Sequence, residues 1–361
     1  MGIGTIVYLI AGLALLVLGA EFLVRGASRI AAMVGLSPLV IGLTIVAYGT
    51  SSPELAVSVQ SSLAGQADIA LGNVVGSNIF NVLFILGLCA LITPLVVAQQ
   101  LIRLDVPILI GVSFLTLMFG ADGKISRVDG IIFFTGAVLY TAFLIIQSRK
   151  ERNPDVQQEY EQEYGNLNGS SLQKGLINVG LILFGLVLLV LGSRWLVESS
   201  IAIARAFGLS ELIIGLTIIA CGTSLPELAT SAIASWRGER DIAVGNVIGS
   251  NIFNILAVLG LSSIISPEGI NVSTAAIRFD IPVMLAVAIA CFPVFFTGNL
   301  ISRREGLLFV GYYIVYTAYL ILDTTGHDSL PLFSKALLLV VIPLTIVILA
   351  LSSLKAVRRN R

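Results

Sequence analysis

Charged residues are scarce in this chain, and the scarcity limits what kind of protein it is. Only 12% of its 361 residues are Asp, Glu, Lys or Arg, whereas a soluble domain carries about 25%. Hydrophobic residues make up 57%, and the mean hydropathy is +0.98. Basic and acidic residues balance at 21 each, so the charge gives no reason to expect a nucleic-acid partner. The composition predicts an integral membrane protein.

Histidine and cysteine are also rare, which excludes several kinds of site. The single histidine, His327, lies in a polar turn, and we expect it to be a surface loop residue. Cys89, Cys221 and Cys291 lie in apolar stretches without a CxxC pair, which is typical of small helix residues. A zinc centre or a Ser/His/Asp triad would need partners that this sequence lacks. We therefore predict neither an enzyme nor a bound cofactor.

Apolar stretches of the length that crosses a bilayer, about 20 helical residues, follow one another along the chain. The eleven candidate spans are residues 3–25, 37–64, 70–94, 101–120, 127–147, 176–198, 210–236, 243–266, 276–297, 303–322 and 330–353. The first is too long for the apolar part of a signal peptide, so we expect it to remain as a helix.

The basic residues favour one orientation of these spans. With the N-terminus outside, 15 of the 21 Lys and Arg residues fall on the cytoplasmic side and 6 fall outside. We therefore expect a protein of the cell (cytoplasmic) membrane with its C-terminus in the cytoplasm. Residues 148–175 are polar and include Pro154, which predicts a flexible cytoplasmic linker.

An internal repeat organises the chain. Residues 35–94 align without a gap to residues 208–267, and 38 of the 60 pairs are identical. Each half would hold five spans, an odd number, so the second half enters the membrane from the opposite side. We predict an all-α integral membrane protein with two inverted-topology five-helix repeats, a 10-span core. The repeats would be residues 1–147 and 176–323, followed by an extra C-terminal transmembrane helix and a basic tail in 324–361.

The first repeated motif is polar although it lies in the middle of a span. It reads Ala47 to Glu54 in one half and Ala220 to Glu227 in the other, with Gly and Pro that interrupt the helix and free backbone carbonyls. An unwound backbone at that depth is tolerated where it lines a cavity or is buried in protein.

Glu54 and Glu227 are the strongest candidates for function, because a charge at mid-bilayer costs about 2.5–3.5 kcal/mol on insertion scales. Across an inverted repeat they can converge and supply a charge of −2, which matches one Ca²⁺ or two Na⁺. Hard cations prefer oxygen ligands, which nearby hydroxyls and carbonyls can complete. Those are on Thr50, Ser51, Thr223, Ser224, Ala47 and Ala220. The alternative is a protonated glutamate that only bonds a neighbouring helix.

The second repeated motif reads G-N-V-x-G-S-N-I-F-N, at residues 72–81 and 245–254. Ser77 and Asn81 are four residues apart and share a helical face, as do Ser250 and Asn254. For these pairs the alternative role is hydrogen bonding between helices. That role is the expected one for Asn73, Asn78, Asn246 and Asn251. We expect Asp68 and Asp241 to cap helix N-termini, with ion attraction at a pore mouth as the alternative, and Asp105 and Asp280 to be interfacial anchors.

The two motifs, each present twice in the same order, resemble the α-repeats of the sodium/calcium exchanger family. The resemblance covers spans one to ten and implies central ion sites between spans 2, 3, 7 and 8 and electrogenic exchange of Na⁺ for Ca²⁺. Carried over by position, the ion ligands would be Ala47, Thr50, Ser51, Glu54, Ser77, Asn81, Ala220, Thr223, Ser224, Glu227, Ser250 and Asn254. Some relatives carry aspartate at the position of Asn254, and asparagine here argues against K⁺ co-transport.

The sequence thus predicts a secondary-active antiporter that exchanges Na⁺ for Ca²⁺ by alternating access, with spans 1 and 6 moving past the core. A Ca²⁺/H⁺ antiporter is the nearest alternative. A cation channel and an intramembrane protease are more remote alternatives, since a protease would need paired aspartates. The partners expected are the transported ions and the lipid bilayer. A monomer would suffice, and the sequence leaves the oligomeric state open.

Overall fold

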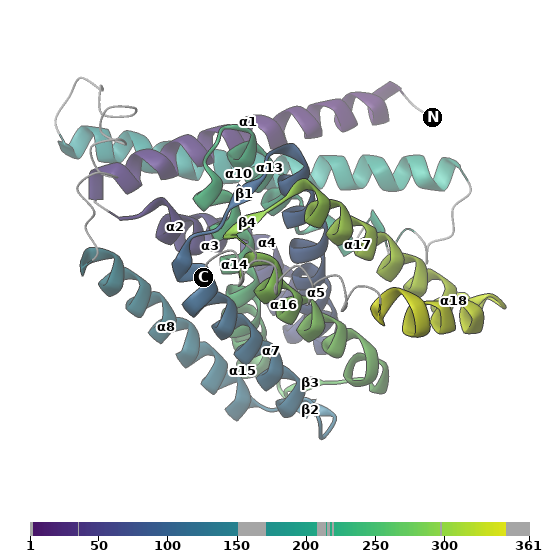
Figure 1. The fold of residues 1–361 in the computed structure, drawn as a ribbon. Helices are drawn as coiled ribbons and strands as arrows, with labels where there is room; N and C mark the ends of the chain where they lie inside the picture. The colour runs from purple at the N-terminus through teal and green to yellow at the C-terminus, as the bar shows by residue number, and fades with distance from the viewer. Residues whose placement is uncertain are drawn as a thin grey trace.

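The computed structural model describes residues 3–34, 36–150, 171–207, 214, 217–218, 220–296 and 298–343, and within these ranges it is almost entirely helical, as predicted (Figure 1). Short π-helical segments, labelled η, continue several helices. The first half contains α1 (Ile3–Val34), α2 (Pro38–Ile41), η1 (Gly42–Val46), α3 (Ala47–Thr50), α4 (Ser52–Leu63), α5 (Ala67–Phe80), η2 (Asn81–Leu86), α6 (Gly87–Ile92), η3 (Leu101–Asp105), α7 (Val106–Phe119) and α8 (Arg127–Lys150).

Within the described residues, the second half repeats most of these helices and adds one short helix beyond them. They are α10 (Ser171–Ala206), α12 (Ala220–Gly222), α13 (Leu225–Trp236), α14 (Arg240–Phe253), η5 (Asn254–Leu259), α15 (Gly260–Ile265), η6 (Ala276–Asp280), α16 (Ile281–Phe296), α17 (Arg303–Thr324), α18 (Leu330–Ala336) and η7 (Leu337–Val341).

Eight described helices are long and apolar enough to cross a membrane, and the bent pair from α2 to α4 makes a ninth. They correspond to predicted spans 1 to 6 and 8 to 10. Of span 7, the structure describes α12 and α13, while residues 208–213, 215–216 and 219 lie outside the described residues. Of span 11, it describes the apolar stretch Leu330–Leu339, and residues 344–353 lie outside. The extra transmembrane helix therefore stays a prediction.

The helices α1 and α10 are longer than predicted, at 32 and 36 residues. At the ends of the expected linker, α8 continues to Lys150 and α10 already begins at Ser171, while residues 151–170 lie outside the described residues. Figure 1 shows α1 and α10 side by side along one edge of the molecule, and their backbones touch at glycines. A Cβ on Gly19 would lie 2.8 Å from the Gly185 carbonyl oxygen, and one on Gly12 would lie 2.9 Å from that of Gly192. Because the numbers rise along α1 and fall along α10, the pair is antiparallel.

This contact predicts that bulk at the paired glycines separates α1 from α10. Gly19→Val and Gly185→Val should each destabilise the protein by about 1–3 kcal/mol, the usual cost of overpacking. Thermal unfolding of the detergent-purified protein measures the effect. Gly4→Val is the matched control, because a Cβ there meets nothing within 4 Å. Equal unfolding temperatures for Gly4→Val and Gly19→Val would contradict the close contact.

Both predicted helix breaks are present and have similar backbone angles. The helix α3 ends at Thr50 and α4 begins at Ser52, with Pro53 in its first turn and a 46° bend between them. At the break, Ser51 has φ −82° and ψ 9°, and Ser224 in the second half has φ −88° and ψ 9°. Proline is accepted in a first turn because that position needs no N–H donor. Each break therefore starts a new helix one residue before the proline.

Two short antiparallel ribbons show how the halves are arranged. The strand β1 (Leu95–Val96) pairs with β4 (Leu300–Ile301), and β2 (Lys124–Ile125) pairs with β3 (Ile270–Asn271). Each ribbon takes one strand from each half. The spanning helix α7 separates β1 from β2, and α16 separates β3 from β4, so the ribbons lie at opposite ends of the core (Figure 1). Equivalent segments of the two halves therefore lie at opposite ends, as an inverted repeat requires.

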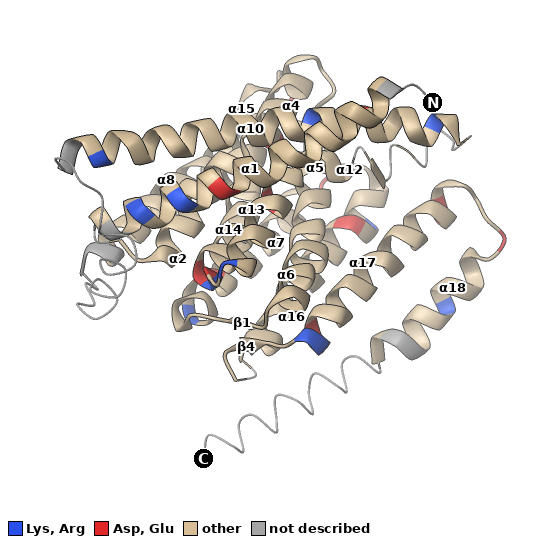
Figure 2. Ribbon diagram, turned by 90° about the horizontal axis from the view of Figure 1, so that it is seen from above, with Lys and Arg blue, Asp and Glu red and all other residues tan. Residues whose placement is uncertain are grey.

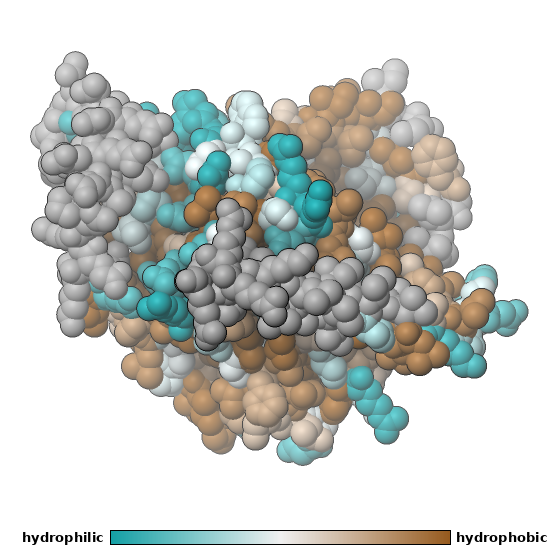
Figure 3. All heavy atoms as spheres, in the orientation of Figure 1, coloured by the Kyte–Doolittle hydropathy of each residue, from teal (hydrophilic) through white to brown (hydrophobic). Residues whose placement is uncertain are grey.

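The centre of the molecule is formed by the third and eighth spans. In the most apolar part of each span, 72% of the residues are buried in Ala67–Ile92 and 94% in Arg240–Ile265, compared with 11% in Arg303–Thr324. The outer helices expose large apolar side chains such as Leu139 and Leu183, and Figure 3 shows hydrophobic residues over much of the visible face. Figure 2 shows that charged residues are few and lie mainly near helix ends and turns. Such a surface suits lipid rather than water.

Candidate cation site

The two breaks place Glu54 and Glu227 inside the molecule. Each lies in the first turn of the helix after its break, α4 or α13. Both side chains are 0% exposed. The ion pairs among the described residues include neither glutamate. Two buried carboxyl groups without a basic partner are costly, which marks the position as a candidate site.

Hydrogen bonds from serine cross between the halves and tie the two glutamates into one site. The Ser51 hydroxyl donates to Oε1 of Glu227 at 2.7 Å, and the Ser224 hydroxyl is 2.9 Å from Oε1 of Glu54. Ser224 Oγ is also 3.0 Å from Ser77 Oγ on α5. Each half thus supplies a hydroxyl to the carboxyl group of the other half, and Ser51, Ser77, Ser224 and both glutamates lie together.

Thr50 is joined to the opposite half by a chain of side chains. Its hydroxyl donates to Oδ1 of Asn246 at 3.1 Å, and Nδ2 of Asn246 donates to Oγ of Ser231 at 2.9 Å and to the Glu227 carbonyl at 3.5 Å. The equivalent bonds are present on the other side. The Thr223 hydroxyl donates to Oδ1 of Asn73 at 3.2 Å, and Nδ2 of Asn73 donates to Oγ of Ser58 at 3.0 Å and to the Glu54 carbonyl at 3.2 Å. Each threonine thus donates its proton to an asparagine and keeps oxygen lone pairs free for another partner.

Several buried oxygens on the predicted ligands have no hydrogen-bond partner among the described residues. They are Oε2 of Glu54, Oε2 of Glu227, Oδ1 of Asn81, Oδ1 of Asn254 and Oγ of Ser250. Ser77 and Ser250 lie one helical turn before Asn81 and Asn254, so each pair shares a face. Leaving a buried acceptor without a donor costs about 1–3 kcal/mol, and more for a charged group. A shared cluster of such acceptors is what a bound cation would satisfy.

The two predicted backbone ligands lie in the short helices before the breaks, α3 and α12. The Ala47 carbonyl accepts from the Ser51 amide at 3.0 Å and lies 3.4 Å from the Thr50 hydroxyl oxygen, so it is not a freed carbonyl. Ala220 is the first residue of α12. The carbonyl that Pro226 leaves without its helical donor is that of Gly222. It accepts from the hydroxyl of Ser193 on α10 at 2.7 Å, so a side chain already satisfies it.

The predictions for three of the four aspartates need correction. The residues at the N-cap position of α5 and α14 are Gln66 and Glu239, while Asp68 and Asp241 lie in the first turns. There they interact favourably with the helix dipole but do not cap. Asp105 is fully buried and accepts from the Tyr140 hydroxyl at 2.8 Å, so it is not an interfacial anchor.

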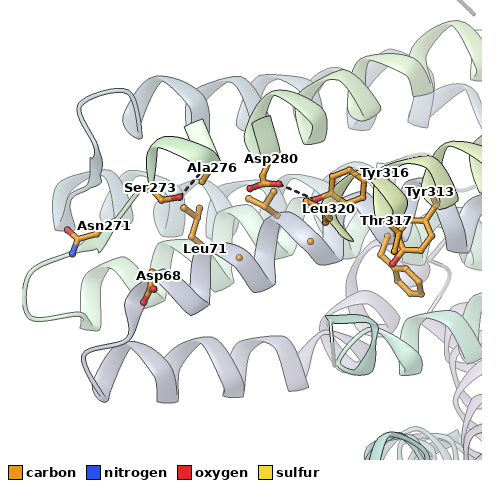
Figure 4. A pocket seen from close by; sticks show the side chains of 14 residues that line it. Asp68, Leu71, Asn271, Ser273, Ala276, Asp280, Tyr313, Tyr316, Thr317 and Leu320 are labelled. Atoms are coloured by element: carbon orange, nitrogen blue, oxygen red, sulfur yellow. Dashed lines mark hydrogen bonds between the residues drawn. The ribbon is translucent and has the colours of Figure 1, made fainter. Parts of the chain in front are cut away.

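A cavity of about 380 Å³ lies along the face of α5 that carries Asp68, Gly72 and Gly76 (Figure 4). Asp280 from η6 and Tyr316 from α17 line it, and their side chains are hydrogen-bonded at 3.3 Å. Because Asp68 lines this cavity rather than capping its helix, the geometry suits the alternative role in ion attraction better than capping.

Ser58 and Ser231 help to position the site, and they are not among the residues predicted from the sequence. Both are fully buried and bind the asparagine that holds the opposite threonine. A signal was present in the sequence. Each serine follows its glutamate by four residues, on the same helical face, and the pair is identical between the halves.

Comparison with known proteins places this arrangement among ion exchangers. The family model described as sodium/calcium exchanger protein matches residues 4–147 and 177–322. The sodium/calcium exchanger MaX1 of Methanosarcina acetivorans is 33% identical over 341 residues, covering 86% of this chain and 97% of that protein. The inner membrane protein YrbG of Escherichia coli is 39% identical over 318 residues, covering 86% and 95%.

A solved structure has the same fold. It is the sodium-calcium exchanger NCX_Mj soaked with Na⁺ and Ca²⁺, with a TM-score of 0.74 and 30% sequence identity. The match covers 88% of this chain and 99% of that structure. The resemblance noted from the repeated motifs is thereby confirmed at the level of both sequence and fold.

Proposed function

This chain belongs to the sodium/calcium exchanger family, and we propose that it exchanges Na⁺ for Ca²⁺ across the cell membrane through the site at Glu54 and Glu227. The observation that carries the proposal is the cluster of buried oxygens without hydrogen-bond partners among the described residues. They comprise carboxylate, amide and hydroxyl oxygens, the ligand types that Ca²⁺ and Na⁺ prefer.

The charge of the site suits competition between the two ions. With both glutamates ionised, the pair carries −2, which one Ca²⁺ or two Na⁺ would neutralise. Ser51 and Ser224 hold one oxygen of each carboxylate and leave Oε2 free. The cations would bind Oε2 together with Oδ1 of Asn81 and Asn254, the hydroxyls of the threonines and serines completing the shell. Ions that share ligands exclude each other, which is the condition for exchange.

The helix α10 is positioned to control access to the site. Its Leu186 side chain lies against Gly49, and its Val197 side chain lies against Gly222, one glycine at each break. Its Ser193 also binds the Gly222 carbonyl. We expect α10 to move together with α1, because their backbones touch at paired glycines. Sliding this pair past the core would uncover one break and cover the other.

Two side chains of α1 tie the pair of α1 and α10 to the core. Nε of Arg237, in the turn between α13 and α14, donates to Oε2 of Glu21 at 2.6 Å. The Ser28 hydroxyl donates to Glu239 in the same turn at 3.2 Å. At the equivalent turn between α4 and α5, Ala64 and Gln66 replace Arg237 and Glu239. The proposed movement of α1 would break these bonds on one side without forming their counterparts on the other.

The coupling ion is tested by ⁴⁵Ca²⁺ uptake into proteoliposomes. Vesicles loaded with Na⁺ and diluted into Na⁺-free buffer should take up Ca²⁺, while K⁺-loaded vesicles and vesicles with only a pH gradient should not. Uptake driven by the pH gradient alone would replace Na⁺ by protons as the counter-ion. Uptake without any counter-gradient would indicate a channel and would contradict exchange.

A further inference from the structure

Asn78 and Asn251 form a closed ring of two reciprocal hydrogen bonds where the halves meet, and Asn81 and Asn254 each donate one bond to it. Asn78 and Asn251 lie near the ends of α5 and α14, and Asn81 and Asn254 begin η2 and η5. All four are buried, with at most 1% of any residue exposed. The bonds run from Nδ2 of Asn78 to the Asn251 carbonyl (3.1 Å), Nδ2 of Asn251 to the Asn78 carbonyl (3.2 Å), Nδ2 of Asn81 to Oδ1 of Asn251 (2.9 Å) and Nδ2 of Asn254 to Oδ1 of Asn78 (3.1 Å).

The chemistry of these groups allows one orientation of each amide. A backbone carbonyl only accepts, so Asn78 must turn its NH₂ toward the carbonyl of Asn251. The Oδ1 of Asn78 then faces Asn254, and because Oδ1 also only accepts, Asn254 must present its own NH₂. The Oδ1 of Asn254 is consequently turned away from the ring. The same reasoning, with the halves exchanged, fixes Asn81 through Asn251.

The two oxygens turned out of the ring are on two of the cation ligands predicted from the sequence. Oδ1 of Asn81 and Oδ1 of Asn254 are among the buried acceptors that lack a partner within the described residues. An amide rotated by half a turn would instead present NH₂, a donor that repels a cation. We propose that Asn78 and Asn251 are positioning residues that hold the amide oxygens of Asn254 and Asn81 toward the transported cation. This inference rests on the proposed function of the site.

A purely structural role for the ring makes a different prediction. If Asn78 and Asn251 only tie α5 to α14, losing either should have the same effect whatever residue stands at 81 or 254. If they orient an amide, their effect disappears when the oriented group has two equivalent oxygens. Asn254→Asp and Asn81→Asp supply such a group, because either oxygen of a carboxylate can bind the cation.

The experiment combines these substitutions and measures KM for Ca²⁺ and the maximal rate of Na⁺-driven Ca²⁺ uptake. In the otherwise unchanged protein, Asn78→Ala should raise KM by about 10- to 100-fold, as loss of a residue that orients a metal ligand does, with a smaller change in maximal rate. In the Asn254→Asp background Asn78→Ala should raise KM little or even lower it. In the Asn81→Asp background its full effect should remain, because Asn81 is oriented by Asn251.

Asn251→Ala should show the converse dependence on background. The Asn81→Asp background should suppress its increase in KM, and the Asn254→Asp background should not. Asn78→Asp is a second variant, because an ionised carboxylate cannot donate to the Asn251 carbonyl, and the same dependence on background is expected. Equal increases in KM in all backgrounds would overturn the positioning role. So would failure of both Asn78 variants to fold in every background, since the ring would then be required for folding alone. Wild-type protein without counter-ion-driven Ca²⁺ uptake would overturn the proposed function itself.

Discussion

Replacing Glu54 by glutamine is expected to abolish Na⁺-driven Ca²⁺ uptake, and Glu227→Gln should do the same. Glutamine has the shape of glutamate, so each variant removes one charge and one ionised oxygen and little else. Both carboxyl groups are fully buried, and each holds the opposite half through a serine. The remaining charge of −1 cannot neutralise a divalent cation away from water.

The expected loss is large because the charge acts in a buried site. Removing one partner of a buried charge pair costs about 2–5 kcal/mol. Since about 1.4 kcal/mol corresponds to tenfold in an equilibrium constant, this is roughly a 30- to 4,000-fold loss of Ca²⁺ affinity. Symmetry between the halves predicts similar losses for the two variants. Initial rates of ⁴⁵Ca²⁺ uptake over a range of Ca²⁺ concentrations measure the effect.

A matched control separates the buried charge from charge in general. Glu198 is an exposed glutamate of α10 that pairs with Arg194 within the same helix. Glu198→Gln should leave uptake close to that of the unchanged protein, because exposed pairs contribute little. Substantial Na⁺-driven uptake in folded Glu54→Gln protein would show that the ions bind elsewhere.

The repeat explains why so much of the site could be predicted from the sequence. Any residue that is identical in the two halves and polar inside a span faces the pseudo-symmetric centre or a partner beside it. That rule predicted that Glu54, Ser51 and their counterparts lie together, which agrees with the serine–glutamate hydrogen bonds, and it gave Asn78 and Asn251 their bonds between helices. The fold was predictable for the same reason, since hydrophobic length and an odd number of spans determine an inverted repeat.

Features that differ between the halves could not be predicted in this way. Ser193 binds the carbonyl freed by Pro226, but the equivalent residue in α1 is Ala20. Only the packing of α10 against the break shows that this hydroxyl reaches the carbonyl. Asp105 could not be predicted for a different reason. Its contact with Tyr140 is repeated by Asp280 and Tyr316, but only the packing of α8 and α17 brings each tyrosine to its aspartate.

The clearest difference between the halves is a tyrosine that comes from a different helix in each half. In the first half the ring of Tyr48, beside the break, packs against the ring of Phe253 with 4.3 Å between the ring centroids, and its hydroxyl bonds Thr141 of α8. The residue equivalent to Tyr48 in the second half is Cys221. There the ring comes from Tyr313 of α17. Its centroid lies 5.2 Å from that of Phe80, and its hydroxyl oxygen lies 3.0 Å from the sulfur of Cys221. A tyrosine ring therefore fills the equivalent space in both halves. In an alignment of the halves, however, the two tyrosines appear only as two unrelated differences.

The stability of the protein without ions should reveal the same two carboxylates by an independent route. Ca²⁺ at about 100 times its dissociation constant should stabilise the folded state by about 2.7 kcal/mol, because it binds only the folded protein. Exchange into Na⁺-free K⁺ buffer that contains a Ca²⁺ chelator should therefore lower the unfolding temperature. The oxygens left without partners are Oε2 of Glu54 and of Glu227, and nothing basic in the described residues replaces the cation.

The double variant Glu54→Gln/Glu227→Gln should behave in the opposite way. Its unfolding temperature should not depend on Ca²⁺, and in ion-free buffer it should exceed that of the unchanged protein, because neutral amides replace two buried charges without partners. Thermal unfolding of both purified proteins, with and without chelator, makes the comparison. An inactive variant that is stable and ion-independent has lost the site and kept the fold. A double variant that Ca²⁺ still stabilises would place the cation outside the cluster of Glu54 and Glu227.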